Sequence, residues 1–257
     1  MSDASTHTTD SAAPPRRSRE ILARLPAPVR RHLDQLTAAL EGALGENLAG
    51  LLVHGSAARG DYREGTSDVD LVIVLADASR APLEAIADPL LLARYAARIE
   101  AMVLTAAEIP RAADVFPLLY DDIRRCHVVL AGKDPFSALT ISDRHRRLRI
   151  EQELREAQIR LRRAVIDAQA SNETLAGVVT RKIRQIRGPL RSLLALSGVE
   201  VADELAAILE KAGSTWEVET APLLTAQGDP DRAHQALSQL LTAAIAIVDG
   251  MDDGEPA

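Results

Sequence analysis

Apolar residues follow two different periodicities in the first third of the chain. Between residues 27 and 45 they recur at helical spacing, with Pro28 suited to a first turn and Gly45 to a C-terminal stop. Residues 49–53 and 71–75 are instead short apolar runs, and the second is rich in β-branched side chains, which predicts buried strands. The pattern therefore predicts a helix followed by two strands, with a polar, glycine-rich link between the strands.

The same alternation of helix and strand continues to about residue 137. Residues 82–99 have a helical pattern that Pro89 could divide in two, residues 100–105 read as a strand, and residues 116–125 read as a short helix. A last strand is expected at residues 126–130, before the breakers Gly132, Asp134 and Pro135. We expect an α+β domain over residues 19–137, a mixed sheet flanked by helices.

From residue 138 the pattern is helical throughout. Residues 143–170 contain neither glycine nor proline, and further helices are expected at residues 173–187, 189–196, 201–211 and 230–249. These segments predict an all-α helical bundle domain over residues 138–250. Residues 1–18 are polar and rich in Ser, Thr and Pro, so we expect a disordered tail there and a flexible tail at residues 251–257.

Composition narrows the class of protein. The chain has 257 residues, of which 47% are apolar but only 2% aromatic, so its cores must be aliphatic. A net charge of −7 argues against nucleic-acid binding over the whole surface. The single cysteine, Cys126, excludes an internal disulfide framework and a cysteine-rich zinc site. No secretory leader and no 18-residue apolar run is found, so the sequence predicts a cytoplasmic protein without a membrane span.

The candidate chemistry lies on either side of the polar link. Asp68 and Asp70 stand at the start of the second strand, where alternate residues project from the same side. Two carboxylates that close repel unless a cation lies between them, and Mg²⁺ prefers such oxygen ligands. At the end of the first strand, Gly55 allows close approach of a phosphate to the backbone, and Ser56 adds a donor. These residues predict metal-assisted attack on a nucleotide phosphorus; the alternative is a hairpin with a polar loop and two capping aspartates.

This arrangement resembles the signature of the DNA polymerase beta-like nucleotidyltransferase superfamily. The family has a Gly-Ser turn, a linker and an acid-apolar-acid strand, which match Gly55-Ser56, residues 57–67 and Asp68-Val69-Asp70. The resemblance to aminoglycoside adenylyltransferases implies a third metal-binding carboxylate on the next strand, where Glu100 opens the apolar run EAMVLT. Two alternatives are that Glu100 only ends the preceding helix and faces water, and that Glu108 takes this role.

The resemblance implies an Mg²⁺-dependent enzyme that moves AMP from ATP to a hydroxyl of a small molecule and releases pyrophosphate. Asp68, Asp70 and Glu100 would hold the metal, with two Mg²⁺ ions when nucleotide is bound. Gly55, Ser56 and Arg59 would contact phosphate. The base of the nucleotide, the acceptor and the oligomeric state are left open. Two other readings also remain: a protein AMPylator like the minimal nucleotidyltransferase antitoxins, and a non-catalytic nucleotide-binding module.

Several further residues have competing interpretations. Arginines cover the helical domain and are either a solvated face or contacts for triphosphate oxygens; RNA contact is disfavoured because aromatic stacking residues are scarce. His54, just before Gly55, is either a strand-end residue or a nucleotide contact. A general base could come from Glu151, Glu153 or Glu173. The cations considered for the triphosphate are Arg144, Arg147, Arg181, Lys182, Arg184 and Arg187.

Overall fold

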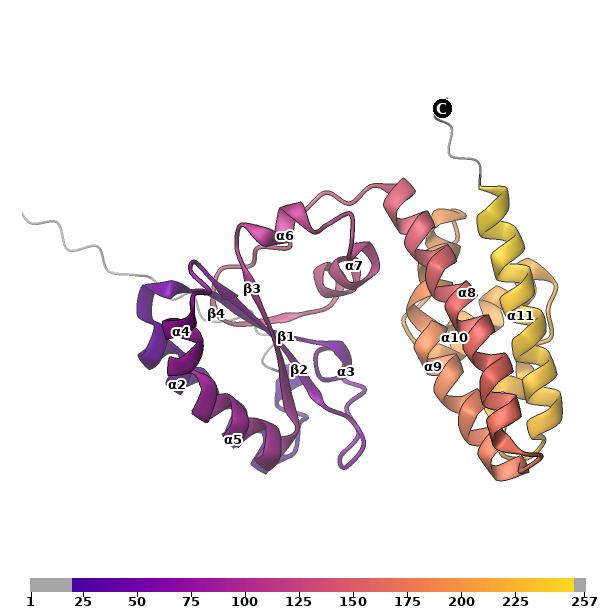
Figure 1. Cartoon of the computed structure of the whole chain (residues 1–257), viewed down its shortest axis with the longest axis horizontal. Coiled ribbons are helices and arrows are strands. Elements are labelled where there is room, and N and C mark those ends of the chain that lie inside the picture. Colours follow the sequence, from indigo (N-terminus) through magenta and orange to yellow (C-terminus); the bar gives the residue numbers. More distant parts are fainter. Residues whose placement is uncertain (1–19, 252–257) are drawn as a thin grey trace, which may run out of the picture. The chain divides into compact units, whose positions relative to one another are not determined.

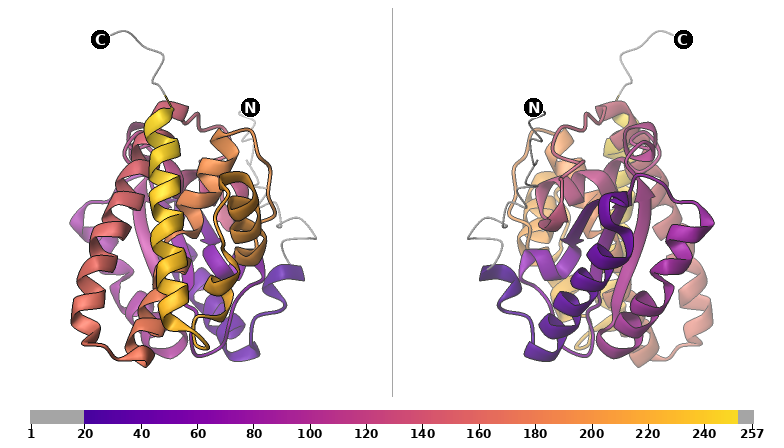
Figure 2. Two further views of the ribbon diagram at one scale, coloured as in Figure 1. Left: turned by 90° about the vertical axis from the view of Figure 1, so that its right-hand side faces the viewer. Right: turned by 90° about the vertical axis from the view of Figure 1, so that its left-hand side faces the viewer.

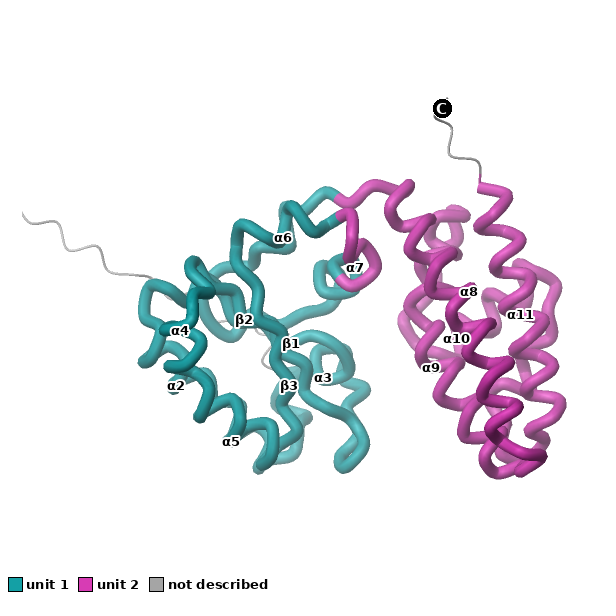
Figure 3. Tube along the Cα trace, in the orientation of Figure 1, with its two compact units in different colours: residues 1–113, 120–140 teal, residues 114–119, 141–257 magenta. Residues whose placement is uncertain are grey.

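The computed structural model describes residues 20–251, which form two compact units (Figure 3). Unit 1 runs to Ala113 and resumes over Tyr120–Thr140, whereas unit 2 contains Asp114–Leu119 and the chain from Ile141 onward. The expected tail at residues 1–18 and all but the first residue of that at 251–257 lie outside the described residues. The expected domain limits, 19–137 and 138–250, stay predictions.

Unit 1 is built on a four-stranded sheet with the strand order β3-β2-β1-β4 (Figure 1). Strand β1 (Leu48–His54) runs antiparallel to both β2 (Val69–Leu75) and β4 (Val128–Gly132), whereas β3 (Ile99–Thr105) runs parallel to β2. The sheet is therefore mixed, which confirms the predicted α+β class.

Strand β4 begins two residues later than the predicted 126–130. The preceding helix ends at Arg125, and the Cys126 amide still donates to the Asp122 carbonyl at 3.0 Å. The His127 ring nitrogen Nδ1 then bonds the Ile123 carbonyl at 2.7 Å. These contacts extend the end of the helix over residues that an apolar pattern assigns to the strand.

Helices cover both faces of this sheet (Figure 1). On one side lie α2 (Ala27–Leu44), the short 3₁₀ turn η1 (Gly45–Asn47), α4 (Arg80–Ala85) and α5 (Ala87–Ala97). On the other lie α3 (Gly55–Arg59), α6 (Glu108–Arg111) and α7 (Pro117–Arg125). The apolar stripe of α2, from Val29 to Leu44, packs with β1 and β2 in one aliphatic core.

The segment expected as one or two helices over residues 82–99 is two helices. The break falls at Ile86 rather than at Pro89. Pro89 lies in the first turn of α5, where a helix makes no use of the amide N–H that proline lacks. The proline is therefore accommodated inside the second helix.

Unit 2 is an antiparallel array of helices, which confirms the predicted all-α region. Its elements are α8 (Asp143–Ala168), α9 (Asn172–Leu196), α10 (Leu205–Trp216), the 3₁₀ helix η2 (Ala221–Thr225) and α11 (Pro230–Gly250). Helices α8, α9 and α11 pack against one another in pairs (Figure 2). Side chains of Ser142, Ser171 and Asp229 accept backbone N–H bonds at the starts of these three helices.

The prediction of separate helices at residues 173–187 and 189–196 is wrong, because α9 runs through Pro189 without a break. An interior proline costs a helix about 3 kcal/mol. Here Leu190, Leu193 and Leu194 are all fully buried, and burying such side chains contributes roughly 1.5–3 kcal/mol each. Tertiary packing therefore outweighs the local preference. Among residues 20–251, no helix combines the length and apolar character needed to cross a bilayer.

Candidate active site

The turn between β1 and α3 lies directly against Asp70. Gly55 has φ +67°, and a Cβ at this position would lie 2.2 Å from Oδ2 of Asp70. Only glycine adopts this backbone easily, and only glycine leaves room for the carboxylate. Ser56 follows as the second residue of α3. The Gly55-Ser56 turn, a candidate phosphate contact, and Asp70, a candidate metal ligand, are therefore adjacent.

Asp70 is the middle member of a row that crosses three strands. It pairs with His54 on β1 and with Glu100 on β3. Residues directly opposite each other project from the same face of a sheet, so all three side chains share one face at one end of the strands. Asp68 stands just before β2 begins. The structure thus brings Gly55, Asp70 and Glu100 together, as the sequence indicated.

Two arginines that the sequence analysis did not single out bind the outer acids. Nε of Arg98 donates to Oδ1 of Asp68 at 2.8 Å, and Nε of Arg94 lies 3.0 Å from Oε1 of Glu100. All four side chains are about half exposed, so each ion pair contributes at most about 1 kcal/mol. The signal for them was present: the arginines end the helix that leads directly into Glu100.

The Asp70 carboxyl is partly buried next to other charged side chains. Burial raises the pKa of its carboxyl above the ordinary value of 3.8, and the nearby Asp68 charge raises it further. The Arg59 charge acts in the opposite direction, while Glu100 and Asp122 add to the rise. Burial and neighbouring carboxylates thus disfavour the charged form of Asp70, and a divalent cation bound there would favour it.

The donor set fits Mg²⁺ in its chemistry, since it consists of carboxylate oxygens on one face of the sheet. Over the part of the chain that the structure describes, however, no three Asp, Glu, His or Cys side chains converge as a metal-binding group. The carboxylates of Asp68 and Glu100 are held by Arg98 and Arg94 instead. Their assignment as metal ligands, together with Asp70, stays a prediction.

Glu108, the alternative third acid, is engaged elsewhere. Its Oε2 accepts the Thr105 amide at 2.7 Å, and this hydrogen bonding lowers the pKa of the Glu108 carboxyl. The Glu108 amide in turn donates to the Thr105 hydroxyl at 3.2 Å. The Glu108 carboxylate is thus hydrogen-bonded at the start of α6, whereas Glu100 pairs directly with Asp70. This geometry favours Glu100 as the third acid.

Arg59, expected as a phosphate contact, closes the other side of the site. Its Nη1 donates to Oδ2 of Asp122 at 3.0 Å, and Nη2 of Arg125 donates to Oδ1 of the same carboxylate at 2.7 Å. Burial lowers the pKa of nearby His54; the charges of Arg59 and His127 lower it further, against the opposing effect of Asp122. These effects together favour the neutral form of the His54 imidazole. Sequence reasoning missed Asp122, which lies 63 residues from Arg59.

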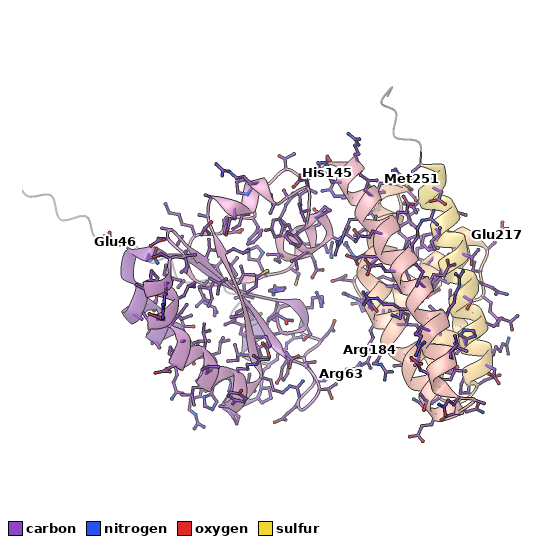
Figure 4. All side chains as sticks on the ribbon, viewed as in Figure 1. Glu46, Arg63, His145, Arg184, Glu217 and Met251 are labelled. Carbon is purple, nitrogen blue, oxygen red and sulfur yellow. The ribbon has the colours of Figure 1, made fainter. Side chains whose placement is uncertain are left out.

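Some of the cations considered in the helical region have structural partners within unit 2. Arg147 donates to the Val248 carbonyl at 3.2 Å, and Arg187 lies 2.7 Å from a carboxylate oxygen of Asp203. Lys182 donates to Gln185 at 2.8 Å. Arg184 projects from α9 (Figure 4) and lines a cavity of about 430 Å³. Arg147 and Arg187 thus have a structural role that accounts for their charge.

The candidate bases Glu151 and Glu153 are also engaged. Glu151 accepts from Arg155 at 2.8 Å, and Glu153 accepts from Arg149 at 2.8 Å. Both are ion pairs along the exposed side of α8. Glu151 and Glu153 therefore stabilise α8 through ion pairs with arginines four residues away along the helix.

Comparison with known proteins agrees with this geometry. Residues 38–159 match the model of a nucleotidyltransferase domain. The structure is similar to that of the spectinomycin adenyltransferase AAD(9) from Enterococcus faecialis, solved with ATP and spectinomycin, with a TM-score of 0.51 and 13% sequence identity. That match covers 86% of this chain and 99% of the other. No curated protein matches the chain in sequence.

The matched domain contains every element of the site. Residues 38–159 include the Gly55 turn, Asp68 just before β2, Asp70 on β2, Glu100 on β3 and the Arg59–Asp122 pair. The similarity in fold to an adenylyltransferase agrees with the resemblance seen in the sequence. Residues 38–159 are therefore a nucleotidyltransferase domain, on a fold similar to that of an adenylyltransferase, and they support a nucleotidyltransferase enzyme.

Proposed function

We propose that this enzyme transfers AMP from ATP to a hydroxyl group of a small molecule, with Mg²⁺ and with release of pyrophosphate. The observation that carries the proposal is the contact between Gly55 and Asp70, with Glu100 next to Asp70 in register. A turn that suits phosphate is thereby placed against a group of acids. The adenylyltransferase neighbour, solved with ATP and spectinomycin, supports both the nucleotide and a small-molecule acceptor.

In this proposal the chain's residues act mainly by position and charge. The backbone at Gly55 and the hydroxyl of Ser56 donate to phosphate oxygens, and Arg59 adds positive charge beside them. Asp68, Asp70 and Glu100 would hold Mg²⁺. When bound there, Mg²⁺ would neutralise triphosphate charge and favour ionisation of the attacking hydroxyl. A bond forms between that oxygen and the α-phosphorus while the bond to pyrophosphate breaks.

A transfer assay tests the proposal. The protein is incubated with each α-³²P-labelled nucleoside triphosphate, Mg²⁺ and a panel of aminocyclitol and aminoglycoside acceptors, with Asp70→Asn as the control. We expect label from ATP on a small molecule and none with the variant. Label on a protein would instead support AMPylation, and no transfer from any nucleotide would support a non-catalytic module. The cytoplasmic location expected from the sequence stays a prediction.

A further inference from the structure

Three charged side chains form a compact group next to the Gly55 turn. Both oxygens of the Asp122 carboxylate are used, one by Arg59 at 3.0 Å and the other by Arg125 at 2.7 Å. The Arg59 side chain is only 17% exposed, and that of Asp122 only 27%. Two guanidinium groups around one carboxylate leave a net positive charge, which suits a place where a polyphosphate binds.

This group is electrostatically coupled to the row of site residues. The Arg59 charge lowers the pKa of Asp70, and the Asp122 charge acts on both Asp70 and His54. The link is also direct along the chain, because α3 begins at Gly55 and ends at Arg59, roughly 6 Å further along the helix axis. A residue that holds the Arg59 side chain therefore holds a positive charge at a set distance from the Gly55 turn.

We propose that Asp122 is a positioning residue for nucleotide binding, which orients Arg59 toward the polyphosphate held at Gly55 and Ser56. The inference rests on the proposed function and adds to it a residue on α7. An arginine side chain has many rotamers, and orienting it before the ligand arrives removes an entropic cost from binding. Asp122 provides this orientation because it holds Nη1 of Arg59 in a half-buried ion pair.

Positioning and simple charge predict opposite results when Asp122 is neutralised. If Asp122 acted only through space, Asp122→Asn would remove a negative charge near the site, and an anionic ligand would bind more tightly. If Asp122 orients Arg59, the same variant weakens the charged hydrogen bond to the guanidinium, and the ligand binds more weakly. The sign of the change in affinity therefore separates the two.

The test measures binding by calorimetry in the presence of Mg²⁺, with two probes. One is inorganic tripolyphosphate, which needs no assumption about the base, and the other is the non-reactive analogue α,β-methylene-ATP. We expect the dissociation constant to rise about tenfold in Asp122→Asn, as for loss of one charged hydrogen bond, and at least as much in Arg59→Gln. The double variant should bind no more weakly than Arg59→Gln, since Asp122 acts through that side chain.

A matched control lies one residue earlier on the same helix. Asp121 is 3.7 Å from Arg124 and does not appear among the charges that act on Asp70 or His54. Asp121→Asn removes the same charge from α7, and we expect its dissociation constants to stay within about twofold of wild type.

Tighter or unchanged binding in Asp122→Asn, or additive effects in the double variant, would overturn the inference. Should Asp122→Asn fail to fold by circular dichroism, Asp122→Glu decides, because it keeps the charge but displaces the carboxylate by one methylene. We then expect binding to weaken about threefold with Arg59 present and not in the Arg59→Gln background. Wild type that binds neither probe would instead refute the proposed function.

Discussion

Replacing Gly55 by alanine tests the geometry at the centre of the site. The new Cβ would lie 2.2 Å from Oδ2 and 3.1 Å from Cγ of Asp70, so the carboxylate must move. The backbone adds strain of its own, because φ at this position is +67° and an alanine pays about 1 kcal/mol there. We therefore expect a modest loss of stability and a large loss of transfer activity.

The activity loss should be roughly 100-fold or more, since a displacement of about 1 Å in a catalytic group has effects of that order. Gly60 provides a matched control at the other end of α3. Its φ is +84°, but a Cβ there would meet only a guanidinium nitrogen of Arg24, at 3.7 Å. Gly60→Ala should therefore lower the melting temperature through backbone strain alone, by no more than Gly55→Ala, and leave most of the activity.

Thermal unfolding and the labelled-nucleotide assay separate the two effects. Both alanine variants should remain folded, and turnover should be lost only in Gly55→Ala. Equal activity in both would show that the position of the Asp70 carboxylate next to Gly55 is unimportant for transfer. A Gly55→Ala protein that is unfolded at 25 °C would show that the contact serves folding instead.

Three further changes test other parts of the site. Ser56→Ala should raise the dissociation constant for ATP about 5- to 30-fold in calorimetry, the loss of one hydrogen bond to a charged group, with an unchanged melting temperature. Glu100→Gln should change metal-free stability by less than about 1 kcal/mol and reduce the rise in melting temperature caused by Mg²⁺. Glu84→Gln, which breaks a more exposed ion pair of the same kind, should keep that rise. Asp70→Asn should abolish transfer. The pKa of Asp70 is raised in the folded state, so its ionisation destabilises the metal-free fold as pH rises above 3.8. Chemical denaturation should therefore find Asp70→Asn more stable than wild type at pH 7, with no difference below pH 3.8. A difference that does not depend on pH would contradict this.

The parts of the site that the sequence predicted are those encoded by local spacing. Gly55-Ser56 and Asp68-Val69-Asp70 are separated by a short link, and the strands on either side pair directly. Glu100 was found because it opens the next strand, and parallel pairing then sets it beside Asp70. Period-two patterning places Asp68 and Asp70 on one face, whereas Gly55 and Ser56 followed from turn chemistry and Glu100 from the family resemblance.

What the sequence did not predict depends on contacts between distant segments. The Arg59–Asp122 pair joins residues 63 apart, and no periodicity marks Asp122 as different from Asp121. Arg98 reaches Asp68 only because it ends α5 with φ +52° and accepts the Val69 amide at 2.9 Å. The unbroken α9 likewise reflects burial of the leucines after Pro189. Each of these features is decided by tertiary packing.

The order of strands in the sheet has a consequence for how the protein folds. Strand β1 pairs with both β2 and β4. Its pair with β2 that has the shortest sequence separation is His54 with Asp70, 16 residues apart. Its pair with β4 that has the shortest separation is Val53 with Val128, 75 residues apart. Closing the longer loop costs about 1.4 kcal/mol more in chain entropy. We therefore expect the β1–β2 hairpin to form first, so that the Gly55 turn and the Asp70 carboxylate come together early. In pulsed hydrogen exchange during refolding, amides of β2 that bond β1 should gain protection before those of β4.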